Sequence, residues 1–220
     1  MPYNKIFFEK VFSEKRMKRY FDLYPNDESR ALMHYKCNLR LSESMYVPIS
    51  VIEVTLRNAI CRELVVMTNR EDWYGAFGRI PELQGLLRYI EQAKNQIESR
   101  HEEVTTPKVV AELTLGFWVS LFNSQYEKSL WKHLRRAFPY MPKNIRKRKA
   151  VSAPLNRIRS LRNRIFHNES ICWNLTTVNQ HHREMIELLG WMNKDMPEWL
   201  AEIDRVPAVS SEIINNLNMR

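Results

Sequence analysis

Glycine is scarce in this sequence, and its scarcity excludes several classes of protein. Only 5 of the 220 residues are glycine, and they form no glycine-rich phosphate loop of either common type. Alternations typical of β-strands are also few, whereas Leu, Glu, Lys, Arg and Met are frequent. This composition predicts an all-α protein.

Cysteine and long apolar runs are also lacking. The cysteines are Cys37, Cys61 and Cys172, which are far apart and lack the spacing of metal ligands or of a redox pair. This usage favours a reduced compartment. The first twelve residues are interrupted by charges and lack the features of a signal peptide. No window approaches the 18 apolar residues of a membrane span, so we expect a cytoplasmic protein with no membrane partner.

Acidic residues are absent from one long segment. Between Glu127 and Glu169 there is no Asp or Glu, but there are 13 Lys or Arg residues. The rest of the chain carries 21 bases against 25 acids, so this segment accounts for the whole net charge of +9. Such asymmetry favours a polyanionic partner, with nucleic acid ahead of anionic lipid. The alternative is a solvated basic surface without function.

Helix start signals recur along the chain, and we expect residues 1–220 to form one all-α domain. Ser13 is expected to cap a helix that runs to about Tyr24, and Asn26 or Asp27 to cap the next. Pro48 suits the first turn of a long apolar helix. Residues 196–220 are expected to form a peripheral helical extension.

The basic segment contains a helix with two different faces. Its apolar positions are Leu155, Ile158, Leu161 and Ile165. Its polar arc carries Asn156, Arg159, Asn163 and His167, turned away from the core. Arg162 lies at the border between the faces, and two antiparallel copies of the helix could bring Arg162 of one chain near His167 of the other. Pro154 is expected to break or kink the helix near its start.

The residue types Arg162, Asn163 and His167 suit phosphate chemistry. Imidazole can act as a general acid or base near neutral pH. Guanidinium stabilises charge that builds on phosphate oxygens, and the asparagine can orient either group. RNA supplies its own 2′-hydroxyl nucleophile, so no metal or cofactor is required. The spacing alone is weak evidence, because an exposed histidine beside arginines is more often an ordinary surface residue.

The sequence around these residues resembles a known family. The stretch "LRNRIFHNE" closely resembles the signature of the Abi-like abortive-infection proteins, which belong to the HEPN superfamily. Other blocks resemble the same family in the same order. They are "FSEKRMKRYF", "ALMHYKCNLRLSESMYVPISVIEVTLRNAI", "DWY", "VVAELTLGFWVSLF", "LWKHLRRAFP" and "NRIRSLRNRIFHNE". The resemblance covers about residues 12–195, and Pro154 departs from the unbroken helix of the family pattern.

The resemblance implies a HEPN-type helical bundle with additional N- and C-terminal helices. It implies a metal-independent endoribonuclease with a composite site at a homodimer interface, in which His167 is the acid/base group, Arg162 the phosphate contact and Asn163 an orienting group. It also implies a role as a toxin or in bacterial antiphage defence, with an antitoxin protein or a non-coding RNA as a possible partner. The alternative is a non-catalytic RNA-binding or scaffold protein.

Further candidates lie outside the motif. The "EVTLRN" block contains Glu53, Arg57 and Asn58, which would support the catalytic residues from a neighbouring helix. The alternative is a simple Glu53–Arg57 pair on the surface of one helix. The residues expected to guide RNA through its phosphates are Arg146, Lys147, Arg148, Lys149, Arg159 and Arg164. Trp73 and Tyr74 could stack on bases, although anchoring of their loop in the core is the simpler interpretation.

Overall fold

The computed structural model describes residues 3–217, which are all-α as the composition predicts. The first helices are α1 (Lys5–Phe12), α2 (Glu14–Leu23), α3 (Glu28–Ser44), α4 (Tyr46–Thr68), α5 (Leu87–Ser99) and α6 (Thr106–Glu112). The later ones are α7 (Leu115–Ser120), α8 (Lys132–Leu134), α9 (Arg148–Phe166), α10 (Leu175–Met192), α11 (Met196–Ala201) and α12 (Val206–Leu217). Short 3-10 or π segments are η1 (Trp73–Arg79), η2 (Pro81–Leu86), η3 (Ser124–Tyr126), η4 (Glu127–Trp131), η5 (Arg135–Ala137) and η6 (Lys143–Ile145). This part of the chain contains no strand.

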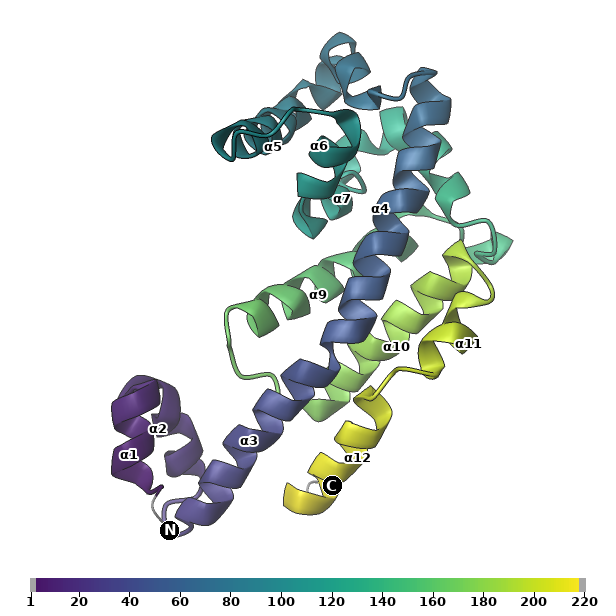
Figure 1. Cartoon of the computed structure of the whole chain (residues 1–220). Helices are drawn as coiled ribbons and strands as arrows, with labels where there is room; N and C mark the ends of the chain where they lie inside the picture. The colour runs from purple at the N-terminus through teal and green to yellow at the C-terminus, as the bar shows by residue number, and fades with distance from the viewer. Residues whose placement is uncertain (1–2, 218–220) are drawn as a thin grey trace.

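Helices α3 and α4 form one long rod through the molecule (Figure 1). Only Met45 separates them, and its backbone keeps a right-handed helical conformation. The interruption follows from Pro48, which has no N–H to donate to the carbonyl of Ser44. The Ser44 hydroxyl instead donates to the Leu41 carbonyl. Pro48 therefore lies in the first turn of α4, as the sequence predicts.

Local capping signals set the first helix boundaries. The Ser13 side chain accepts a hydrogen bond from the Arg16 N–H at the start of α2. Asp27 accepts from the Arg30 N–H at the start of α3. Both caps are confirmed, because they depend on residues only three positions apart.

Helices α9 and α10 lie across the middle of the rod (Figure 1). Helix α10 packs against both α4 and α9. The predicted apolar face of α9 is confirmed: Leu155, Ile158 and Leu161 are buried, and Ile165 packs on the same core. Because this face packs on the core, side chains on the opposite side of α9 are the ones that can reach solvent.

Pro154 does not break α9, and the expectation of a break is wrong. The helix continues from Arg148 to Phe166 with Pro154 inside it. An interior proline costs about 3 kcal/mol or more. Here Val151, Leu155 and Ile158 on the same helix are fully buried, and burial of such side chains contributes about 1.5–3 kcal/mol each. Tertiary packing thus outweighs the local penalty.

The ends of the chain pack on the rod from two sides. Helices α1 and α2 lie beside the lower part of α3, and α12 runs along α3 as well (Figure 1). In the predicted C-terminal extension, Leu200, Val206 and Ile213 are buried in the same core as α4 and α9, so α11 and α12 are integral to the bundle. Residues 218–220 lie outside the described part.

The aromatic residues of the "DWY" block belong to the core. Trp73 is 1% exposed and Tyr74 is 9% exposed, which leaves neither ring free to stack on a base. Their role is to anchor η1 beside α4. Among residues 3–217, no helix has the length and apolar character needed to cross a membrane.

Candidate active site

Helix α9 ends at Phe166, in a tight turn that includes the predicted catalytic residue His167. The His167 N–H donates to the Asn163 carbonyl at 2.9 Å, and the Asn168 N–H donates to the Ile165 carbonyl at 2.9 Å. The Glu169 N–H then reaches back to the Arg164 carbonyl at 2.8 Å. Asn168 has a φ of 55°, which is the left-handed conformation that such a Schellman turn requires. The turn ends the helix abruptly and leaves the His167 side chain exposed.

Arg162 points toward α4 from the last turns of α9. Its Nε lies 3.9 Å from Glu53 Oε2, and its guanidinium carbon lies 4.1 Å from the centre of the Phe166 ring. The Nε atom is buried and has no hydrogen-bond partner in residues 3–217. The side chain is therefore held by a carboxylate and an aromatic face while one donor remains unsatisfied.

The three supporting residues of α4 are not equivalent. Glu53 faces Arg162, and no Glu53–Arg57 ion pair forms in the described structure. Arg57 lines a hollow of about 190 Å³ beside Phe166 and Tyr46. Asn58 is exposed. Glu53 and Arg57 therefore lie next to the end of α9, whereas Asn58 is not part of that hollow.

Asn163 is predicted to orient the phosphate or the imidazole, and that role stays a prediction. Its backbone carbonyl holds the N–H of His167, and its side chain is exposed. One residue thus links the two ends of the last turn while its amide group stays open to solvent.

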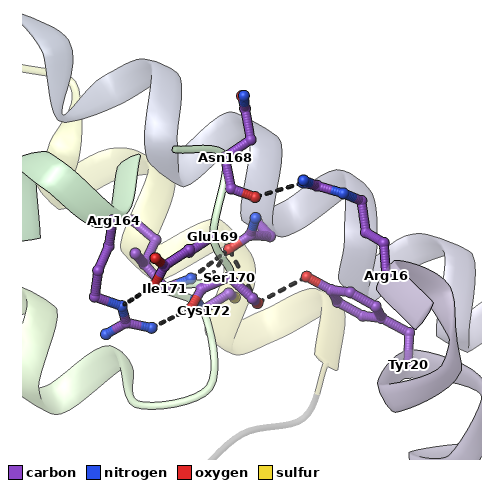
Figure 2. A network of polar contacts seen from close by, with 9 residues as sticks. Arg16, Tyr20, Arg164, Asn168, Glu169, Ser170, Ile171 and Cys172 are labelled. Carbon is purple, nitrogen blue, oxygen red and sulfur yellow. Dashed lines mark hydrogen bonds and ion pairs between the residues drawn. The ribbon is translucent and has the colours of Figure 1, made fainter. Parts of the chain in front are cut away.

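Residues of α2 and α3 form hydrogen bonds to the turn that carries His167 (Figure 2). The Arg16 guanidinium of α2 donates to the Asn168 carbonyl at 2.5 Å. The Tyr20 hydroxyl shares a hydrogen bond of 2.7 Å with Ser170 Oγ. Burial raises the pKa of Tyr20 to about 12, so the phenol stays protonated at neutral pH. These contacts limit the movement of the turn.

Asn38 of α3 is the buried anchor of the same turn. Its Oδ1 accepts hydrogen bonds from the N–H groups of Ile171 at 2.7 Å and Cys172 at 3.1 Å. Motif spacing did not identify Arg16, Tyr20 or Asn38. For Asn38 one signal exists, because an asparagine at an apolar position of an amphipathic helix needs an internal partner.

Several arginines of the basic segment form ion pairs, although the segment itself contains no acid. Acids from outside that segment approach five of them, in the pairs Glu63–Arg136, Glu127–Arg148, Glu184–Arg157, Glu53–Arg162 and Glu169–Arg164. The acid-free segment therefore does not form a continuous surface of unpaired positive charges.

The predicted RNA-guiding residues divide into two groups. In the first group, the guanidinium forms hydrogen bonds to other parts of the protein. Arg146 donates to the carbonyls of Pro139 and Met141. Arg148 donates to the Glu127 carboxylate at 2.8 Å and to the Phe122 carbonyl at 2.7 Å. Arg164 is the third such residue, with its guanidinium donating to the Ser170 carbonyl. The second group comprises the exposed Lys147 and Lys149 and the half-buried Arg159.

An exposed apolar surface borders the end of α9. Tyr46 is 60% exposed and Phe166 is 48% exposed. Both also line a second hollow of about 610 Å³, together with Leu39, Ile203 and other residues from α3, α4 and the α11–α12 connection. Arg162, His167 and this apolar surface thus lie around one end of α9.

No protein-family model, curated protein or solved structure matches this chain. The family resemblance therefore rests on the sequence blocks quoted above.

Proposed function

We propose that the chain is a metal-independent endoribonuclease of the HEPN type, of the Abi-like kind. The observation that carries the proposal is the arrangement at the end of α9. Arg162 lies beside Glu53, and its buried Nε atom has no hydrogen-bond partner among residues 3–217. His167 is exposed about one turn later, where hydrogen bonds hold the backbone in place. A charge-stabilising group and an acid/base group are thus both presented at one helix end.

The chemistry requires only groups of the protein and the RNA. A neutral His167 removes the proton of a 2′-hydroxyl, and the 2′-oxygen attacks the adjacent phosphorus. Arg162 stabilises the negative charge that builds on the phosphate oxygens. The 5′-oxygen leaves with a proton from a second imidazole, and the product is a 2′,3′-cyclic phosphate. Asn163 orients the phosphate or the imidazole.

A homodimer would complete this site. One chain offers one His167, whereas the two proton transfers are best served by a pair of imidazoles. The apolar surface around Tyr46 and Phe166 supports a second copy as the occupant, because it adjoins the residues that the pairing has to bring together. Exposed apolar patches of this kind are typical of interaction sites.

RNA is proposed to reach the site along Lys147, Lys149 and Arg159. These side chains have no carboxylate within ion-pair distance in the described structure. Phosphate contacts of this kind give affinity that falls steeply with salt. Arg146, Arg148 and Arg164 would support this path by holding the backbone rather than by direct contact.

The test is incubation of total RNA with the purified chain in excess chelator, followed by mapping of the new ends. We expect cuts that leave 2′,3′-cyclic phosphates, and we expect His167→Ala to abolish them. His101→Asn is the matched control, because His101 is also exposed and its φ of 58° suits asparagine. Equal cutting by wild type and His167→Ala would remove the site assignment.

The same experiment separates the alternative. Wild-type protein that shifts RNA on a gel but never cuts it would favour a non-catalytic RNA-binding or scaffold role. For the proposed role as a toxin or in antiphage defence, expression of wild type should arrest bacterial growth while His167→Ala does not. An antitoxin protein or non-coding RNA would then be sought as a suppressor of that arrest.

A further inference from the structure

A separate cavity of about 290 Å³ lies on the other side of α9 from Glu53, between α9 and the start of α10. Its polar lining comes from α2, α9, the connection between α9 and α10, and α10: Arg19, Ser160, Arg164, Trp173, Asn174, Thr177 and His181. Leu161, Ile171 and Val178 form its apolar part. Its volume lies at the lower end of small-molecule sites, which span roughly 300–1,000 Å³.

The lining is rich in hydrogen-bond donors and contains no carboxylate. Two guanidinium groups, two hydroxyls and two ring systems with N–H groups contribute to it. Such a set disfavours a cation and suits a ligand that is anionic and rich in acceptor atoms.

Two of the residues that line the cavity carry a buried nitrogen atom without a partner. These atoms are Trp173 Nε1 and His181 Nδ1, and neither has a hydrogen bond within residues 3–217. A buried polar group left without a partner costs about 1–3 kcal/mol, so native proteins usually satisfy it with water or a ligand. Burial lowers the pKa of His181, so this ring tends to be neutral and to hold a single N–H.

Arg19 supplies a positive charge that nothing nearby neutralises. Its guanidinium carbon lies 4.2 Å from the centre of the Trp173 ring, and no acid of the described chain lies within ion-pair distance of it. The stacking fixes the plane of the guanidinium and leaves its edge available. Arg164 adds a second guanidinium, which also donates to the Ser170 carbonyl and lies 3.4 Å from the Glu169 carboxylate, so Arg19 is the guanidinium without an acidic neighbour among the described residues.

We propose that this cavity binds a small molecule through a phosphate monoester group. A phosphate offers several acceptor oxygens and up to two charges, which match two guanidinium groups and the hydroxyls of Ser160 and Thr177. The start of α10 lies at the same place, and helix N-termini favour anions. The proposal is independent of the ribonuclease assignment.

The test is calorimetric titration of the full chain, in a chloride buffer of fixed ionic strength, with adenosine 5′-monophosphate. Inorganic phosphate serves as a competitor, and adenosine serves as the control that lacks the phosphate. We expect saturable binding of the monophosphate with a Kd of about 1 mM or tighter, displacement by inorganic phosphate, and no binding of adenosine.

Two variants and one control place the binding in the cavity. Arg19→Gln removes the free charge, and Trp173→Phe removes an unpartnered N–H while keeping an aromatic ring. Each should weaken binding by about tenfold or more, the loss of one charge-assisted or buried hydrogen bond. Arg183→Gln, an exposed arginine of α10 outside the cavity lining, should bind as wild type does. Arg164 is not substituted, because it also holds the turn.

Three outcomes would overturn the proposal. The first is that neither the monophosphate nor inorganic phosphate gives saturable binding. The second is that Arg183→Gln weakens binding as much as Arg19→Gln, which would indicate general attraction to a basic surface. The third is that a 5′-phosphorylated RNA oligonucleotide binds while adenosine 5′-monophosphate does not, which would reassign the cavity to RNA ends.

Discussion

At the residue scale, the Glu53 carboxylate lies beside the Arg162 guanidinium, 3.9 Å from its Nε atom, and we propose that it positions that group for cleavage. The pair is partly exposed, with 29% and 26% of the two side chains accessible, so its contribution to stability is small, about 0–1 kcal/mol. In Glu53→Gln we therefore expect an intact fold with reduced cleavage. A fall of roughly tenfold in kcat with little change in KM is expected for loss of one transition-state positioning contact.

Glu63→Gln is the matched control for this substitution. Glu63 lies on the same helix and pairs with Arg136 at 2.9 Å, in a different part of the structure. Its cleavage kinetics should equal those of wild type, and both variants should keep the wild-type melting temperature within a few degrees. An equal loss of kcat in the two variants would show that the carboxylate beside Arg162 has no special role.

The residues of α9 also show what sequence can predict at this scale. The burial of Leu155 and Ile158 follows from a local period. The partners of Arg146 and Arg148 do not, because they are carbonyls and a carboxylate that other segments of the fold bring close. A count of charges along the chain cannot distinguish an arginine that faces solvent from one that closes a loop.

At the scale of elements, one amide of α3 is the buried anchor of the turn after α9. Asn38 is 3% exposed and accepts from the buried N–H groups of Ile171 and Cys172. In Asn38→Leu both groups lose their acceptor, and each buried orphan costs about 1–3 kcal/mol. We expect the free energy of unfolding to fall by about 2–5 kcal/mol, as measured by urea denaturation, with faster amide exchange at residues 170–172.

Asn95→Leu provides the comparison for that variant. Asn95 is exposed on α5 and far from the turn, so its replacement should change the free energy of unfolding by no more than about 0.5 kcal/mol. An Asn38→Leu protein as stable as Asn95→Leu would contradict the anchoring role.

Helix ends divide into those that sequence predicts and those that it does not. The caps at Ser13 and Asp27 are local and are predicted well. The continuity of α9 through Pro154 is not, because the packing that holds it comes from distant residues. Helix α1 has no start signal among those assigned from the sequence: it has no buried residue, and Lys5, Glu9 and Lys10 interrupt its apolar side chains.

At the scale of the whole molecule, stability should depend on pH through one buried and two half-buried histidines. Burial lowers the pKa of His34, His133 and His181 below the ordinary value of 6.5. The unfolded chain therefore binds more protons than the folded chain as the pH falls below 6.5. Stability should be fully present above that pH and should decline toward pH 5.5, where carboxyl groups still contribute little.

Urea denaturation at pH 7.5, 6.5 and 5.5 measures this decline. His34→Phe keeps an aromatic ring beside Trp173 and Tyr20 but cannot take up a proton. Its free energy of unfolding should fall less between pH 6.5 and 5.5 than that of wild type, by up to about 1.4 kcal/mol per pH unit for one proton. Identical slopes for the two proteins would exclude His34 as a source of the decline.

The apolar surface around Tyr46 and Phe166 is the face at which we propose that a second copy of the chain binds. The two hollows that share these residues measure about 610 and 190 Å³ and adjoin Arg162 and the turn after His167. A surface of this kind on an isolated chain exposes apolar area to water. Burial of that area contributes a favourable free energy of about 25 cal/mol per Å². A symmetric pair would use the same patch twice and bring two α9 ends together.

Tyr46→Glu tests this relation, because it places a charge in the centre of the patch. We expect wild type to sediment as a dimer and Tyr46→Glu to sediment as a monomer that has lost cleavage. Val66→Glu is the matched control: Val66 is 64% exposed, Tyr46 is 60% exposed, and both lie on α4 at opposite ends. Val66→Glu should remain dimeric and active. A monomeric wild type that cuts RNA at full rate would show instead that one chain holds the complete site, and the need for a second imidazole would fall with it.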